Sequence, residues 1–132
     1  MFTDGSLNDS GGIGAAYYDE SMDSTTKITV GMGEGILRAE LTAILKIIQD
    51  KQGADSVLRV FTDSLLSIRL IRRWMYFSHE LGHTDNMDML DSIGQALADR
   101  GGRTELYKVR AHIGVEGNEK ADEGAKEVAQ GK

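Results

Sequence analysis

The sequence contains no cysteine and no proline, and it has no long hydrophobic run. Without cysteine the chain forms no disulfide and offers no thiolate, so a bound metal ion would need carboxylate oxygens or imidazole nitrogens as ligands. No apolar stretch approaches the roughly 18 residues that a membrane span requires. We therefore expect no membrane association, and we have no physical explanation for the missing proline.

Positive charge is also scarce. The 132 residues carry 15 lysines and arginines against 21 acids, which gives a formal net charge of -6. Proteins that bind nucleic acids usually present a basic surface, so this balance argues mildly against such a partner, although bound divalent cations would offset part of the negative charge. The length predicts one domain over residues 1–132, which we expect to be a monomer. No secretory signal is apparent, which favours an intracellular location.

Hydrophobic periodicity predicts an α/β fold. Alternating or β-branched apolar residues predict strands near residue 2 and over residues 11–20, 25–32, 57–62 and 104–109. Helical spacing predicts helices over residues 37–49, 65–75 and 87–97 and from residue 118 onward. In the second of these helices the predicted apolar face carries Leu66, Leu70 and Trp74, and His79 and His83 follow in a predicted loop without an assigned role.

The triplet Phe-Thr-Asp occurs twice, at residues 2–4 and 61–63. Asp63 ends the strand predicted over residues 57–62, which lies between two helical segments as a parallel strand of a βαβ unit does. Ligand sites in open α/β sheets lie at the carboxyl ends of such strands. A helix N-cap aspartate is equally ordinary there, and for Asp63 considered alone capping is the better interpretation.

Two more acids occupy unusual positions in predicted helices. At about 100° per residue, Glu40 falls within the apolar arc of its helix, where a carboxylate must be neutralised or bound to a cation. A helix-flank acid that caps or reaches solvent is the alternative, and without context it is the better supported one. Asp122 borders the apolar face near the start of the last helix, where the helix dipole favours an anion.

Together, these acids need one explanation. A compact mixed sheet would bring Asp4, Glu40, Asp63 and Asp122 to one place. Two carboxylates about 4 Å apart repel by roughly 4 kcal/mol at an effective dielectric near 20, so the cluster requires bound cations or shared protons. Oxygen ligands favour Mg²⁺ or Mn²⁺, and two such ions would stabilise the attacking and leaving oxygens of a phosphodiester displacement. The sequence therefore predicts hydrolysis of a nucleic-acid backbone.

Five segments in order resemble type 1 ribonuclease H: residues 2–6, 11–15, 38–41, 61–64 and 111–122. They read Phe-Thr-Asp-Gly-Ser, Gly-Gly-Ile-Gly-Ala, Arg-Ala-Glu-Leu, Phe-Thr-Asp-Ser and Ala-His-Ile-Gly-Val-Glu-Gly-Asn-Glu-Lys-Ala-Asp. Any one of them is a weak signal, but the spacing from His112 through Asn118 to Asp122 is specific to the family. The resemblance spans nearly the whole chain.

The resemblance implies a ribonuclease H-like α/β fold, in which helices flank a five-stranded mixed sheet of order 3-2-1-4-5. It implies an endonuclease that cuts the RNA strand of RNA/DNA hybrids with two Mg²⁺ ions, for which Mn²⁺ would substitute. The four acids would be the catalytic metal ligands. His112 would assist proton transfer or product release, which suits a group that titrates near neutrality. Without the motif, a capping or surface histidine would be the better interpretation.

Four further residues in the matching segments are predicted to contact substrate: Gly5, Ser6, Arg38 and Asn118. The chain departs from the bacterial pattern, because residues 35–37 lack the expected polar side chains, Leu65 stands where glutamine is common, and no lysine-rich protrusion follows Trp74. These departures do not involve the four acids. They involve positions that we expect to affect how tightly the chain binds hybrid.

The motif forms resemble the ribonuclease H domains of retroelement polyproteins, where an adjoining reverse transcriptase domain would be a partner. Two alternatives stay open. One is a catalytically weak or inactive ribonuclease H-like domain that binds nucleic acid within a polyprotein. The other is an exonuclease or an integrase-like nuclease, because the fold alone does not fix the substrate.

Overall fold

The computed structural model describes residues 1–30, 35–52, 57–81, 86–110 and 114–131. Within these ranges the strands are β1 (Phe2–Leu7), β2 (Ile13–Asp19), β3 (Ser24–Thr29), β4 (Leu58–Thr62) and β5 (Thr104–Lys108). The helices are α1 (Ile36–Asp50), α2 (Leu65–Leu81), α3 (Met87–Asp99) and α4 (Glu116–Ala129). In the part of the chain so described, no helix is both long enough and apolar enough to cross a membrane.

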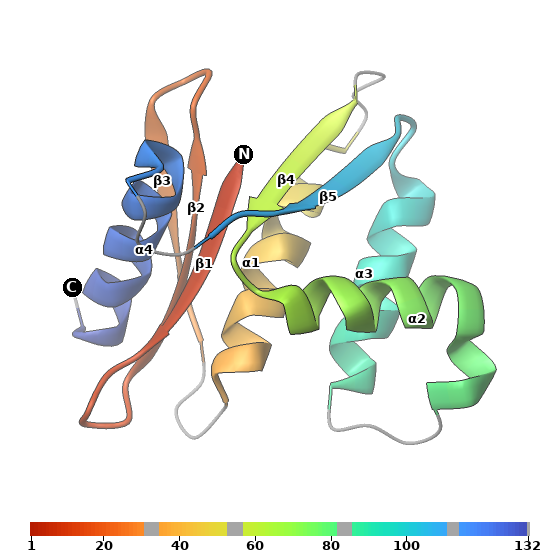
Figure 1. The fold of residues 1–132 in the computed structure, drawn as a ribbon, viewed down its shortest axis with the longest axis horizontal. Helices are drawn as coiled ribbons and strands as arrows, with labels where there is room; N and C mark the ends of the chain where they lie inside the picture. The colour runs from red at the N-terminus through yellow and green to blue at the C-terminus, as the bar shows by residue number, and fades with distance from the viewer. Residues whose placement is uncertain (31–34, 53–56, 82–85, 111–113, 132) are drawn as a thin grey trace.

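The strands form one mixed sheet in the order β3-β2-β1-β4-β5. The pairs β1–β2 and β2–β3 are antiparallel, whereas β1–β4 and β4–β5 are parallel. Helix α4 packs on β1, β2 and β3, while α1 packs on β1 and β2 from the opposite face, and α2 and α3 lie toward β5 (Figure 1). The predicted fold class and strand order are therefore confirmed.

The main hydrophobic core lies between α1, α3 and the sheet. Leu41, Ile44 and Ile47 of α1 are fully buried there, and burial of each such side chain stabilises the fold by about 1.5–3 kcal/mol. Ala39 and Ala43 join a smaller cluster with Ile13 of β2. Because α1 is fixed by apolar contacts along most of its length, any polar side chain on this face is held in place as well.

Helix α2 differs most from its prediction. It continues to Leu81, so His79 is helical rather than in a loop, and His83 lies outside the described residues. Of the predicted apolar face, Leu70 and Trp74 are partly buried against the core, whereas Leu66 is exposed. Ser67, Ile68 and Ile71 are buried. The reason is the direction of the side chain: Ser67, Ile68 and Ile71 form the buried face of α2, and at about 100° per residue Leu66 points away from that face.

Candidate active site

The two Phe-Thr-Asp triplets are paired with each other. In the parallel ladder between β1 and β4, Phe2 pairs with Phe61 and Thr3 pairs with Thr62. The phenylalanine rings stack with their centroids 4.9 Å apart, and both threonines are fully buried. The ladder ends at this point, so the next residue on each strand is an aspartate. The repeat thus places two carboxylates side by side, with Asp4 inside β1 and Asp63 just after the carboxyl end of β4.

Glu40 reaches this place because α1 approaches β1 very closely at Gly5. A Cβ atom on Gly5 would lie 2.9 Å from the Ala39 Cβ and 2.9 Å from the Glu40 backbone nitrogen. The Gly5 amide donates a hydrogen bond to the Glu40 carboxylate, whose side chain is buried with the residue only 7% exposed. The position predicted from the apolar arc is confirmed, and Glu40 is not a solvent-exposed flank acid.

The helix-capping role considered for Asp63 is performed by its neighbour. The Ser64 Oγ accepts a hydrogen bond of 3.2 Å from the Ser67 amide and lies 2.7 Å from the Ser67 Oγ. This is the side-chain contact by which a serine N-cap satisfies an amide of the first helical turn. Asp63 is therefore placed at the strand end, half-buried, beside the other acids.

Carboxylate oxygens of Asp4, Glu40 and Asp63 lie within 4.8 Å of one another. Asp122 of α4 joins them from the opposite face of the sheet through a side-chain hydrogen bond with Asp4. The structure thus brings together all four acids that the sequence singled out. The four acids come from β1, from the end of β4, from α1 and from α4, so no single segment of the sequence contains the site.

Burial and mutual repulsion disturb the titration of these acids. Loss of hydration, followed by the contacts and charges of Asp122, Glu40 and Asp63, raises the pKa of Asp4 to about 10. Loss of hydration and then the charge of Asp63 raise the pKa of Glu40 to about 8. Both groups therefore favour the protonated state near neutral pH in the absence of cations.

The donor set fits a hard divalent cation. Within the described residues, the Glu40 Oε2 atom is buried without a hydrogen-bond partner, which is costly for a carboxylate oxygen. A cation at the cluster would provide the missing partner and would replace the shared protons. The residues are all oxygen donors, which suits Mg²⁺ or Mn²⁺ better than softer metals.

One charged residue at the site was not identified from the sequence. The Lys126 Nζ lies 2.9 Å from the Asp122 Oδ2, one helical turn away on α4. This hydrogen bond and the charge of Asp122 raise the pKa of Lys126, and the charge of Asp4 adds to the effect. The sequence did contain one indication of this contact, because Lys126 follows Asp122 by four residues and side chains at that spacing are neighbours on a helix.

The predicted substrate residues lie in different surroundings. Gly5 is buried against α1, as described, and Ser6 is half-buried on β1. The Arg38 guanidinium donates hydrogen bonds of 2.9 and 2.7 Å to the two carboxylate oxygens of Asp88 on α3. Asn118 is only 2% exposed, and His112 lies outside the described residues. The substrate roles of these residues and the role of His112 stay predictions.

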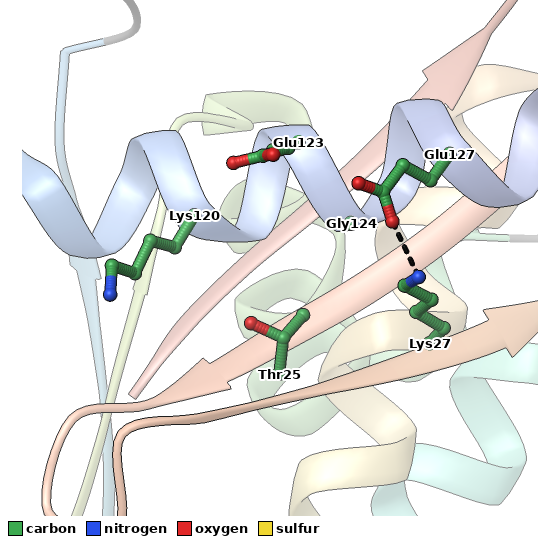
Figure 2. A pocket seen from close by; sticks show the side chains of 6 residues that line it. All are labelled: Thr25, Lys27, Lys120, Glu123, Gly124 and Glu127. Carbon is green, nitrogen blue, oxygen red and sulfur yellow. Dashed lines mark ion pairs between the residues drawn. The ribbon is translucent and has the colours of Figure 1, made fainter.

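A second concentration of charge lines a shallow groove of about 230 Å³ between β3 and α4. Its lining residues are Thr25, Lys27, Lys120, Glu123, Gly124 and Glu127, as Figure 2 shows. Lys27 forms an ion pair with Glu127 across the groove, and Lys120 pairs with Asp23 at 3.0 Å. Two lysines and two glutamates line the groove and face solvent, whereas the acid cluster gathers carboxylates in a largely buried setting.

The family model described as RNase H matches residues 1–130 of the chain. A comparison with curated proteins gave no match.

Proposed function

The chain belongs to the ribonuclease H family, and from this premise we propose that it is a metal-dependent endonuclease that hydrolyses the RNA strand of RNA/DNA hybrids. Ribonuclease H activity follows from the family, and the mode of cleavage and the mechanism are the proposal. The observation that carries it is the buried carboxylate cluster, in which oxygens of three acids lie within 4.8 Å of one another. We take residues 1–132 as one domain.

The acids would hold two divalent cations, Mg²⁺ or, as a substitute, Mn²⁺. Asp4, Glu40 and Asp63 are the ligands supported by their mutual distances, and Asp122 is supported by its contact with Asp4. When bound, such ions supply Lewis-acid stabilisation of the attacking and leaving oxygens in an in-line displacement. The other contributions to catalysis would come from the positions in which the fold holds the chain's own side chains.

The framework holds the carboxylates in place before substrate arrives. The β1–β4 register fixes Asp4 and Asp63, and the close contact at Gly5 fixes Glu40. Asp4 and Glu40 are almost fully buried, and electrostatic interactions are stronger where water is excluded. The cluster therefore needs little rearrangement to bind cations, which is the condition for efficient electrostatic catalysis. His112 is proposed to transfer a proton or to assist product release.

Substrate contacts are proposed for Gly5, Ser6, Arg38 and Asn118. A hybrid duplex displays 2′-hydroxyls in a wide and shallow groove, so backbone and shape are read rather than sequence. The Arg38–Asp88 pair holds a guanidinium at the N-terminal end of α1, two residues before Glu40. A phosphate would compete with Asp88 for this guanidinium.

The test compares the wild-type chain with Asp63→Asn on a labelled RNA/DNA hybrid, a double-stranded RNA and a DNA duplex. The wild type is expected to cut the RNA of the hybrid internally and only with Mg²⁺ or Mn²⁺, and the variant is expected to lose at least about 100-fold of this activity, as when one electrostatic stabiliser is removed. Glu123→Gln, which changes an acid of the groove in Figure 2, is the matched control.

Retained Mg²⁺-dependent cleavage by Asp63→Asn would contradict the assigned role. Preferred cleavage of a DNA duplex, or removal of single nucleotides from an end, would favour the other nucleases of this fold. Binding of hybrid without turnover in either metal would favour a binding domain.

A further inference from the structure

We propose that Lys126 acts as a built-in competitor for the metal at Asp122, so that it weakens the binding of one divalent cation and not of the other. The inference rests on the proposed metal site. It starts from the distance of 2.9 Å between the Lys126 Nζ and the Asp122 Oδ2. A cation that uses this carboxylate must therefore displace or share the partner that already holds it.

The two parts of the acid cluster differ in what surrounds them. Asp4, Glu40 and Asp63 form a compact set with oxygens within 4.8 Å of one another. Asp122 lies outside this set, its side chain is 19% exposed, and it is held by an ammonium group. A cation that used Asp122 would lie next to the ammonium that contacts this carboxylate at 2.9 Å, whereas the charge of Lys126 reaches the compact set only through its weaker attraction to Asp4. The repulsion would therefore be stronger for the cation at Asp122.

Lys126 also reduces the negative charge of the site when cations are absent. Its ammonium is attracted by Asp4 as well as by Asp122, so it stabilises the ionised form of both acids. The same charge that stabilises the metal-free protein opposes a divalent cation. Lys126 is thus a positioning residue that sets how much metal the site requires, rather than a group that touches the reacting atoms.

A second lysine on the same helix provides the matched comparison. The Lys120 Nζ pairs with Asp23 at 3.0 Å and lies 5.0 Å from the centre of the Tyr18 ring. Figure 2 shows Lys120 at the groove beside β3. Lys120 and Lys126 both form ion pairs with acids, but only Lys126 pairs with an acid of the cluster. An ordinary surface ion pair contributes little to stability, and a structural role of that kind predicts no effect on metal binding.

The experiment measures Mg²⁺ and Mn²⁺ binding by isothermal titration calorimetry, without nucleic acid, in the wild type and in Lys126→Met, Lys126→Arg and Lys120→Met. Lys126→Met is expected to bind the weaker ion about tenfold more tightly, because a unit positive charge close to a divalent cation is removed in a partly solvated site. Lys126→Arg keeps the charge and is expected to match the wild type. Lys120→Met is also expected to match it.

Unchanged or weaker binding of the second ion in Lys126→Met, with the wild type binding normally, would overturn the inference and leave the proposed function intact. Lys126→Gln is the second variant if circular dichroism shows that Lys126→Met is poorly folded. Asp63→Asn is the reference that loses the compact set. A wild type that binds neither metal would overturn the proposed metal site, and the inference with it.

Discussion

Two regions along α4 contain the same types of residue and have opposite properties. At the acid cluster, Asp122 meets Asp4 and other carboxylates in a buried setting. In the groove of Figure 2, Lys27 and Glu127 pair across an exposed surface, with side chains 42% and 36% accessible. Exposed pairs contribute only about 0–1 kcal/mol, whereas buried like charges are costly. An electrostatic cost that the folded protein retains indicates that the acid cluster has a function. The paired charges of the groove have no such cost and give no such indication.

The difference between the two regions arises because adjacent residues of α4 point in different directions around the helix axis. Asp122 and Glu123 are adjacent in sequence, yet successive residues point about 100° apart around the axis. Asp122 therefore faces β1 and the cluster, and Glu123 faces the groove. Residue type alone does not distinguish the two acids.

Replacing an acid in each region should produce the largest difference. Asp4→Asn is expected to lower hybrid cleavage by at least about 100-fold, because the site loses a central carboxylate. The same variant is expected to lose less stability than the wild type as pH rises in EDTA, because an asparagine at this position cannot ionise. Steady-state cleavage and chemical denaturation measure the two effects.

Glu127→Gln is the partner experiment, since it removes an acid from the other region. It is expected to leave cleavage within twofold of the wild type. Equal losses of activity in Asp4→Asn and Glu127→Gln would mean that burial and repulsion do not separate the two regions.

Two glycines allow the helix contacts of the regions to be compared. Gly5→Ala would place a Cβ 2.9 Å from the Ala39 Cβ and from the Glu40 backbone nitrogen, and such overpacking costs about 1–3 kcal/mol. It is also expected to displace Glu40 and to lower cleavage about tenfold or more, since small misplacements of catalytic groups are costly. Thermal unfolding and cleavage rates test both.

Gly124→Ala is the matched change in the groove. Its Cβ would lie 2.7 Å from the Cγ2 of Thr25 and 3.0 Å from the Ala16 Cβ. Thr25 is exposed, so we expect its side chain to move aside, with a smaller loss of stability and little loss of activity. A larger effect on cleavage from Gly124→Ala than from Gly5→Ala would show that α4, rather than α1, limits the geometry of the site.

Local patterns predicted the α/β class and singled out the four acids, and the resemblance to ribonuclease H implied the strand order that the structure has. The repeat at residues 2–4 and 61–63 indicated two related strand segments, and the ladder pairs their phenylalanines and their threonines. Glu40 was placed correctly by helical spacing, although its burial required the contact with Gly5. These features are short-range in sequence or periodic.

Features that depend on the packing of distant elements were missed. Leu66 has the spacing of a core residue, but the buried face of α2 is formed by Ser67, Ile68 and Ile71, and Leu66 points away from it. The capping role considered for Asp63 belongs to Ser64, and this required the positions of side-chain oxygens. The contact between Lys126 and Asp122 became significant only when Asp4 was found beside it.

Stability of the metal-free protein should depend on pH through the cluster and not through the groove. Asp4 and Glu40 have folded-state pKa values raised to about 10 and about 8, above their ordinary values of 3.8 and 4.5. The folded protein therefore holds more protons than the unfolded chain between about pH 5 and pH 8, and its stability falls as pH rises, by about 1.4 kcal/mol per pH unit for each extra proton.

Denaturant titrations in EDTA across this range test the sign. The slope is expected to be shallower in Asp63→Asn, because the charge of Asp63 is one cause of the raised pKa of Glu40. A stability that rises with pH over the same interval would contradict the assignment of the cluster as a set of desolvated, repelling acids.

The smallest effect is expected for the ion pair of the groove. Lys27→Ala removes the partner of Glu127 on an exposed surface, so the free energy of unfolding should change by less than about 1 kcal/mol. Cleavage should be unchanged. A loss of several kcal/mol, measured by denaturation, would show that the groove is under greater electrostatic constraint than its exposure indicates.

The central claim is that the buried acids of the cluster are held together at the expense of stability until cations bind. The most direct measurement is the shift in unfolding midpoint when Mg²⁺ replaces EDTA at pH 8, compared between the wild type and Glu40→Gln. A ligand that binds only the folded state stabilises it, so Mg²⁺ is expected to raise the wild-type midpoint by several degrees and to raise that of Glu40→Gln much less. Equal shifts in the two proteins would contradict the account.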